Sequence, residues 1–145
     1  MNLKLINVKE EHWDYIMDLR NEFFQKYFDK QNEPLIKSQH YAYMKKQAEN
    51  QNFHQWIAVT DENSLVGYVR ILDFDINIMV NAEFHNKGFG TIILQLVEEK
   101  ARKLNPDYFF VMPYGFINEF IKREKKWLKS GGKFVLPYPN FKIVK

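Results

Sequence analysis

The fold is decided by one stretch of sequence, Val80-Asn81-Ala82-Glu83-Phe84-His85-Asn86-Lys87-Gly88-Phe89-Gly90-Thr91, in which a turn joins a hydrophobic strand to an amphipathic helix. Gly88 and Gly90 stand one residue apart, and glycine reaches positive φ or lets a ligand approach where a Cβ would obstruct. The first turn of the helix adds unpaired N–H groups and the positive end of the helix dipole. The stretch therefore predicts an anion site of the kind that holds phosphate.

Two common phosphate motifs do not fit this spacing. A Walker loop needs four residues between its glycines and then Gly-Lys-Ser/Thr, and a dinucleotide fingerprint needs three glycines. An isolated pair of glycines is also frequent in turns that only reverse the chain, so the surrounding elements must decide between the two interpretations.

The stretch resembles the pyrophosphate-binding motif of the GNAT superfamily of acyl-coenzyme A N-acyltransferases. That motif reads Gln/Arg-x-x-Gly-x-Gly/Ala and follows a strand with a Val-x-Pro-Glu-like ending. In this sequence, residues 80–83 correspond to the strand ending and residues 85–90 to the motif. Both glycines match. His85 stands in place of Gln or Arg and Ala82 in place of Pro, which leaves the backbone amides as the part of the motif that is retained.

The expected order of elements is similar to the same family along nearly the whole chain. Apolar periodicities of 2 and 3.6 residues predict strands at 3–8, 55–60, 65–72, 76–80, 108–112, 134–136 and 141–144, and helices at 11–28, 38–50, 91–104 and 117–130. Ser38 is the expected N-cap of the second helix. The resemblance implies an α/β (α+β) GNAT fold, with a mixed, mostly antiparallel sheet flanked by about four helices. It implies a single domain over residues 1–145.

Composition excludes several classes of protein. The 145 residues fit one domain, and 46% hydrophobic content excludes a disordered chain. The absence of cysteine excludes disulfides and thiol catalysis, and the four histidines lack metal-ligand spacing, so no metal is expected. No apolar run approaches the length of a membrane span, and no signal region follows Met1, so we expect a cytoplasmic protein with no membrane partner.

Charge is concentrated at the C-terminal end. Residues 120–145 hold eight Lys or Arg and one Glu. Such a run is more often a solvated helix face than a nucleic-acid site. Because no stacking aromatics or nucleic-acid signature accompany it, we expect no nucleic-acid partner.

The resemblance implies acetyl-coenzyme A (acetyl-CoA) as cosubstrate. Its pantetheine arm would pair with the backbone of the strand that ends at Val80, whose amide would polarise the thioester carbonyl, and its pyrophosphate would lie in the glycine turn. The cofactor-binding residues expected on this basis are Ile78, Val80, His85, Asn86, Lys87, Gly88, Phe89, Gly90, Thr91 and Asn118.

An amine must lose a proton before it attacks, so a carboxylate, or a water held by one, is expected near the thioester. Asp73, Asp75 and Glu83 are the candidates. Asp75 is the catalytic candidate of the three, because strand alternation places it on one face with Asn77 and Met79.

The general acid is left open. Many relatives carry an Asn on the fourth helix, a Tyr seven residues later that protonates the departing thiolate, and then Lys-x-Gly. Asn118 resembles that start, but Trp127 stands near the Tyr position, two residues too far along, and an indole cannot act as an acid. Either the thiolate leaves without an acid, or Tyr114 substitutes for the missing Tyr, or the chain is not an efficient transferase.

The first two helices are expected to bind the acceptor. Arg20 and Asn21, followed by Ile36 and His40, resemble the branch that acetylates amino groups of nucleotide-linked sugars and its relatives that act on protein N-terminal amines, including the ribosomal-protein type. The predicted substrate-binding residues are Arg20 and Asn21.

The predicted function is acetyl transfer from acetyl-CoA to a primary amine. The expected acceptor is an amino sugar, free or linked to a nucleotide, or another small molecule. The alternative is a non-catalytic acyl-CoA-binding or protein-interaction module on the same scaffold. The sequence leaves an oligomer open.

Overall fold

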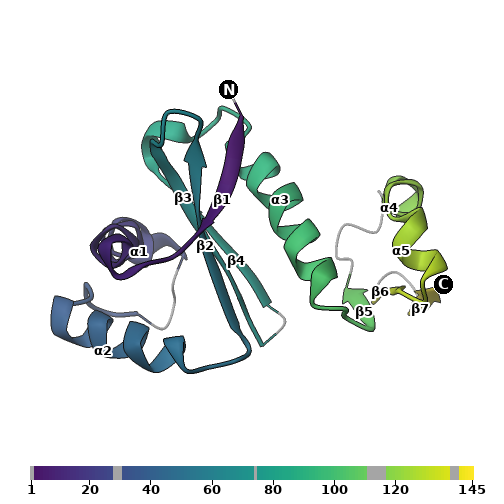
Figure 1. The fold of residues 1–145 in the computed structure, drawn as a ribbon, viewed down its shortest axis with the longest axis horizontal. Coiled ribbons are helices and arrows are strands. Elements are labelled where there is room, and N and C mark those ends of the chain that lie inside the picture. The colour runs from purple at the N-terminus through teal and green to yellow at the C-terminus, as the bar shows by residue number, and fades with distance from the viewer. Residues whose placement is uncertain (1, 28–30, 74, 111–116, 138–140) are drawn as a thin grey trace. The chain divides into compact units, whose positions relative to one another are not determined.

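A computed structural model of the chain describes residues 2–27, 31–73, 75–110, 117–137 and 141–145 (Figure 1). The chain forms two compact units, Met1–Glu98 and Glu99–Lys145, and each is described by itself.

The first unit is built on a four-stranded antiparallel sheet. Its strands are β1 (Leu3–Asn7), β2 (Phe53–Thr60), β3 (Leu65–Leu72) and β4 (Asp75–Val80), and they are hydrogen-bonded in the order β1-β2-β3-β4. One row of facing residues runs across it through Ile6, Ile57, Tyr68 and Met79. In this strand order β4 lies at one edge of the sheet.

Helices α1 (Trp13–Tyr27) and α2 (Lys37–Ala48) cover one face of the sheet, and α3 (Phe89–Lys103) begins on the other (Figure 1). A short 3-10 helix, η1 (Glu10–His12), precedes α1. The buried cluster under α1 and α2 consists of Trp13, Ile16, Leu19, Met44, Ile57, Val59, Tyr68 and Met79. Under α3, Ile93 and Val97 are fully buried, as the apolar periodicity of that helix predicts.

Gly67 lets β3 and β4 approach each other beneath α3. A Cβ at this position would lie 2.5 Å from the carbonyl oxygen of Met79 and 3.4 Å from Cδ1 of Ile93. Both neighbours are fixed, one as backbone and one as core, so this glycine is required by packing.

The second unit pairs β6 (Lys133–Leu136) in parallel with β5 (Tyr108–Phe110) and antiparallel with β7 (Lys142–Val144). Two short helices, α4 (Ile117–Arg123) and α5 (Lys125–Lys129), belong to the same unit. The ring of Trp127 packs 4.7 Å from Phe109 and 5.3 Å from Phe134, centroid to centroid. Trp127 is half-buried and packs against the sheet of this unit.

The predicted α/β fold with a mostly antiparallel sheet is confirmed, and two details of the predicted helices were wrong. Ser38 is not an N-cap, because α2 begins at Lys37 and its cap residue, Ile36, makes no side-chain cap hydrogen bond. The expected last helix is two helices that meet at Glu124, whose buried carboxylate accepts hydrogen bonds from Arg102 at 2.7 Å and Arg123 at 2.8 Å. Across the described ranges, no helix has the length and apolarity that a bilayer crossing requires.

Gly67→Ala should destabilise the first unit, because the new Cβ has to displace either the β4 backbone or Ile93. We expect a loss of about 2 to 3 kcal/mol in the free energy of unfolding, measured by urea titration. Gly90→Ala is the matched control, since its Cβ would sit 4.0 Å from Val80 Cγ2, an ordinary contact. Equal stability of the two variants would contradict this account of Gly67.

Candidate functional site

Among the described residues, the outer edge of β4 carries backbone groups that pair with no other strand. The N–H of Asn81 donates to the carbonyl of Val66 at 2.9 Å, which makes Val66 and Asn81 a hydrogen-bonded pair of the β3–β4 ladder. Because such pairs alternate in an antiparallel ladder, the backbone groups of Met79 point towards β3 and those of Ile78 and Val80 point away from it. The structure therefore places the N–H and C=O groups of both expected pantetheine-binding residues on the free side of an edge strand.

A tightly wound turn follows β4. Asn81 caps the 3-10 helix η2 (Ala82–Phe84) by accepting a 3.0 Å hydrogen bond from the N–H of Glu83. Asn86 then takes φ 58° and Gly88 takes φ 78°, both in the left-handed region. These conformations bring the chain round to the first residue of α3.

The backbone amides of this turn are available to a ligand. Within the part of the chain that the structure describes, the amide of His85 bonds the carbonyl of Ala82, whereas those of residues 86–91 donate no backbone hydrogen bond. Apart from its two chain neighbours, a Cβ at Gly88 would meet no atom of the described residues within 4 Å, so the space beside this glycine is open there. Free amides next to open space at a helix N-terminus form an anion site.

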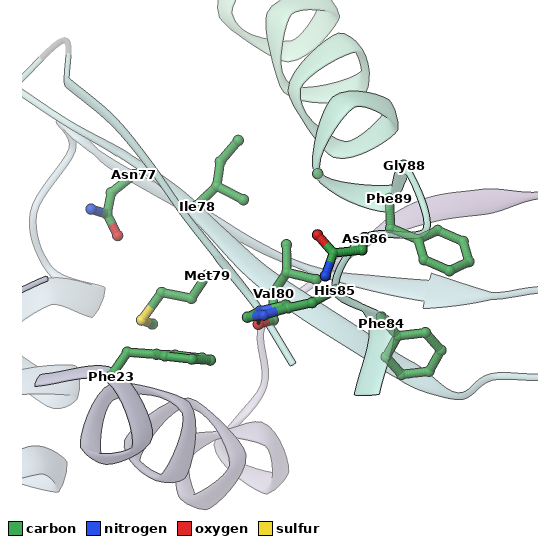
Figure 2. Close-up of a pocket in the computed structure, with 11 residues that line it drawn as sticks. Phe23, Asn77, Ile78, Met79, Val80, Phe84, His85, Asn86, Gly88 and Phe89 are labelled. Carbon is green, nitrogen blue, oxygen red and sulfur yellow. Dashed lines mark hydrogen bonds between the residues drawn. The ribbon is translucent and has the colours of Figure 1, made fainter. Parts of the chain in front are cut away.

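A pocket of about 440 Å³ wraps around the free edge of β4 and includes this turn (Figure 2). Ile78 and Val80 reach it from the α3 face of the sheet, and Asn77 and Met79 reach it from the opposite face. Its other lining residues are Phe23 from α1, and Phe84, His85, Asn86, Gly88, Phe89 and Gly90 from the turn and α3. This site is called the edge pocket below.

His85 links the turn to β4 and α1 through its side chain. Its Nε2 lies 2.8 Å from the carbonyl oxygen of Val80, so Nε2 carries the proton and donates. Its ring stacks on Phe23 of α1 with a centroid distance of 5.4 Å and an interplanar angle of 21°. His85 thus connects α1, the end of β4 and the turn, and it leaves the N–H of Val80 on the open edge.

The remaining turn residues are exposed. The Nζ of Lys87 lies 5.6 Å from the centre of the Phe84 ring. Thr91 lies in the first turn of α3 with its side chain exposed. Neither of these two lines the edge pocket.

A second pocket, of about 360 Å³, lies between the sheet and helices α1 and α2. It is called the helix pocket below. Its lining residues are Ile16, Arg20, Leu35, Gln39, His40, Tyr43, Met44, Tyr68, Arg70, Asn77 and Met79. Asn77 and Met79 line both pockets, so the two sites share one stretch of β4.

The two predicted substrate-binding residues have different surroundings. Arg20 lines the helix pocket, where its Nε donates to Oε1 of Gln31 at 2.8 Å. Burial lowers the pKa of Arg20, and the charge of the nearby Arg70 lowers it further. Asn21 lines neither pocket. Its side chain accepts from the N–H of Leu35 at 2.6 Å and donates to the carbonyl of the same residue at 3.0 Å, which fixes the connection into α2.

His40 of α2 is a buried imidazole in the wall of the helix pocket, with 4% of its surface exposed. It hydrogen-bonds the backbone of Trp13, and its Nε2 has no partner among the described residues. Burial lowers the pKa of His40, and Arg20 lowers it further, against the opposing effects of the hydrogen bond to Trp13 and of Asp14. The ring is therefore neutral at pH 7 and carries an unused acceptor.

The candidate acids and bases lie elsewhere. Asp73, Asp75 and Glu83 are exposed and line neither pocket. Asn118 is exposed on α4 of the second unit, and Tyr114 lies outside the described residues. The wall residues that sequence reasoning did not single out as binding residues include Phe23, Tyr43, Tyr68 and Arg70, which become neighbours only through the tertiary fold.

Comparison with known proteins places this geometry in a family. Residues 13–111 match the model of the Acetyltransferase (GNAT) family. A domain from Methanocaldococcus jannaschii DSM 2661 superposes with a TM-score of 0.61 at 20% identity, covering 71% of each chain. Spermidine N-acetyltransferase from Vibrio cholerae, solved with CoA and spermine, superposes with a TM-score of 0.60 at 18% identity, covering 72% of this chain and 67% of that one.

A curated protein also matches over a short segment. The C-methyltransferase NovU of Streptomyces niveus is 33% identical over 46 residues, 32% of this chain. The match spans 11% of the length of that protein, about a tenth. A segment of that size carries no argument about activity.

Gly88→Ala should weaken coenzyme A binding by roughly 10- to 100-fold, because a side chain enters the space in which the pyrophosphate would approach the amides and a charge-assisted hydrogen bond is lost. Gly131→Ala is the matched control, since Gly131 also has positive φ and also faces open space, in the second unit. Calorimetric titration should show wild-type affinity for the control. Wild-type affinity in Gly88→Ala would contradict the assignment of the turn.

Proposed function

Because the chain belongs to the acetyltransferase (GNAT) family, whose enzymes use acetyl-CoA, we propose that it transfers the acetyl group of acetyl-CoA to a primary amine of a small acceptor. The finer form of the proposal takes an amino sugar, free or nucleotide-linked, as that acceptor. The observation that carries the proposal is the edge pocket, which combines amides without a backbone partner in a glycine turn with outward-facing backbone groups on the adjacent strand edge.

The two halves of the edge pocket suit the two ends of the cosubstrate. The amides of residues 86–91 and the N-terminus of α3 favour the pyrophosphate. The outward N–H and C=O groups of Ile78 suit the pantetheine amides, which would pair with β4 as an added strand does.

Transfer needs an electrophile held against β4. The carbonyl of Val80 already accepts the hydrogen bond from His85, so the N–H of Val80 is the group that remains to polarise the thioester carbonyl as negative charge develops on its oxygen. The amine attacks the carbonyl carbon, the C–S bond breaks, and coenzyme A leaves as a thiolate. In this proposal Val80 acts through its backbone, and the identity of its side chain matters for packing.

The acceptor enters from the helix pocket. Asn77 and Met79 form a wall that both pockets share, so an amine that lies against this wall lies next to the thioester end of the edge pocket. Spermidine N-acetyltransferase from Vibrio cholerae, which shares this fold, was solved in complex with CoA and spermine, and this supports a small amine as acceptor class.

His40 is the group that takes the proton from the amine. Among the described residues lining the helix pocket, it is the side chain that accepts a proton near neutral pH, because the pKa of Tyr68 is raised by burial and the arginines stay charged. Its lowered pKa keeps Nε2 in the acceptor form at pH 7. Asp75 remains the candidate that strand alternation suggests, and its exposed position suits a role through water.

Acetyl-CoA should stabilise the protein against heat. At a hundred times its dissociation constant it should add about 2.7 kcal/mol, which corresponds to a rise of roughly 5 to 10 °C in the melting temperature for a chain of this size. Thiol release in the presence of glucosamine should then report transfer. Stabilisation without thiol release for any amine would favour a non-catalytic acyl-CoA-binding module over the transferase.

His40→Gln should lower kcat by roughly 100- to 10,000-fold while leaving acetyl-CoA affinity unchanged, as removal of a general base does. Since the folded pKa of His40 lies below the ordinary 6.5, the base form persists at neutral pH and kcat of the wild type should fall only as pH drops below 6.5. This fall of kcat at low pH is the acid limb of the pH profile. The variant should lose it, as a pH profile of kcat would show.

His12→Gln is the control for this variant. His12 is also buried, but its Nδ1 accepts from the N–H of Lys9 at 2.9 Å and it lines neither pocket. The control should lose stability and keep the acid limb. An unchanged limb in His40→Gln would show that His40 is structural.

A further inference from the structure

The walls of the helix pocket carry positive charge. Arg20 comes from α1 and Arg70 from β3, and the described residues that line the pocket include no aspartate or glutamate. His40 adds no charge at neutral pH because its pKa is lowered. Two guanidinium groups thus face one small space in which a cation would be repelled.

The position of Arg70 is fixed by the fold. Its Nη1 donates to the hydroxyl of Tyr43 on α2 at 2.9 Å, which ties the guanidinium to the pocket wall. Its strand partners are Gln55 and Asn77, so the residue stands directly beside the wall that both pockets share. A guanidinium held in this way presents its remaining N–H groups as a fork, which suits the oxygens of a carboxylate or phosphate.

Other groups in the pocket are also hydrogen-bond donors. The amides of Gln39 and Asn77 line it. Tyr68 uses its hydroxyl to donate to Oε1 of Gln55 at 3.0 Å, so this buried group is already satisfied within the wall. The pocket therefore offers cationic and amide donors around a single neutral base.

We propose that the acceptor of this enzyme carries an anionic group, a carboxylate or a phosphate, which Arg70 binds together with Arg20 while the amine lies against Asn77 and Met79. The inference rests on the proposed acetyl transfer to a small amine. It separates this chain from an enzyme for polyamines, because spermidine and spermine carry several positive charges and no anion.

The pocket has room for both parts of such an acceptor. A volume of about 360 Å³ lies at the lower end of the range for small-molecule sites, which suits an amino acid or an aminosugar phosphate. In the nucleotide-linked form of the proposed function, the diphosphate would be the anion. The shared chemistry is an anion a short distance from a primary amine.

Binding of matched pairs to the CoA-saturated protein tests the proposal. Glucosamine 6-phosphate is compared with glucosamine, and β-alanine with β-alaninamide, by calorimetric titration, with spermidine as the polycationic probe. We expect the anionic member of at least one pair to bind at least about 10-fold more tightly, the effect of one charge-assisted hydrogen bond. The pair that discriminates identifies the anion as phosphate or carboxylate.

Arg70→Gln should reduce that preference to less than about 3-fold, because the fork is lost, and Arg70→Lys should retain part of it as a point charge. The control is Lys45→Gln, which removes the same charge from an exposed position on α2 outside both pockets and should leave the preference unchanged. Wild-type affinity of each variant for coenzyme A would show that the edge pocket is intact.

The proposal is overturned if neither pair discriminates, if spermidine binds more tightly than the anionic probes, or if Arg70→Gln keeps the wild-type preference. Thiol release is followed in parallel with acetyl-CoA. Absence of thiol release with every amine counts against the proposed function, whereas the binding ratios decide the charge of the acceptor by themselves.

Discussion

The site depends on the hydrogen-bond alternation of the β3–β4 ladder. The bond from Asn81 to Val66 sets which residues of β4 face β3, and it leaves the backbone groups of Ile78 and Val80 on the free edge. A shift by one residue would turn Met79 and Asn77 to the edge instead and would move every side chain of β4 to the opposite face of the sheet. Gly67 permits the close approach of β3 and β4 in this register, because a Cβ there would press on the carbonyl of Met79.

His85 shows how one substitution within a motif is accommodated. The family pattern has Gln or Arg at this position, and the sequence alone suggested a lost ligand contact. In the structure the ring bridges Val80 and Phe23 instead, so it contributes to the shape of the turn and to the attachment of α1. The amides of residues 86–91, which donate no backbone hydrogen bond among the described residues, would serve as the proposed anion site without a side chain from this position.

Local sequence signals predicted the secondary-structure elements from which the edge pocket is built. The strand ending at Val80, the glycine turn and the amphipathic helix after it are contiguous, so periodicity and turn chemistry were sufficient to predict them. The helix pocket was predicted only in part. Arg20 and His40 were expected in an acceptor site on the first two helices and line this pocket, whereas Arg70 was not expected there, because it meets Tyr43 only when α2 packs on β3. The break at Glu124 was also missed, and one of the two bonds to the Glu124 carboxylate comes from Arg102 on α3, outside the two short helices.

The wall formed by Asn77 and Met79 connects the two pockets chemically. Met79 is part of the buried core under α1 and α2, so its position is fixed by packing, whereas Asn77 is partly exposed and offers an amide to either side. Because Asn77 pairs with Arg70 across the ladder, the group that would recognise the acceptor lies on the strand next to the one that would hold the cosubstrate. The sheet would then set the distance between an anion on Arg70 and a thioester on β4, and acceptors of the wrong length would place their amine away from the carbonyl carbon.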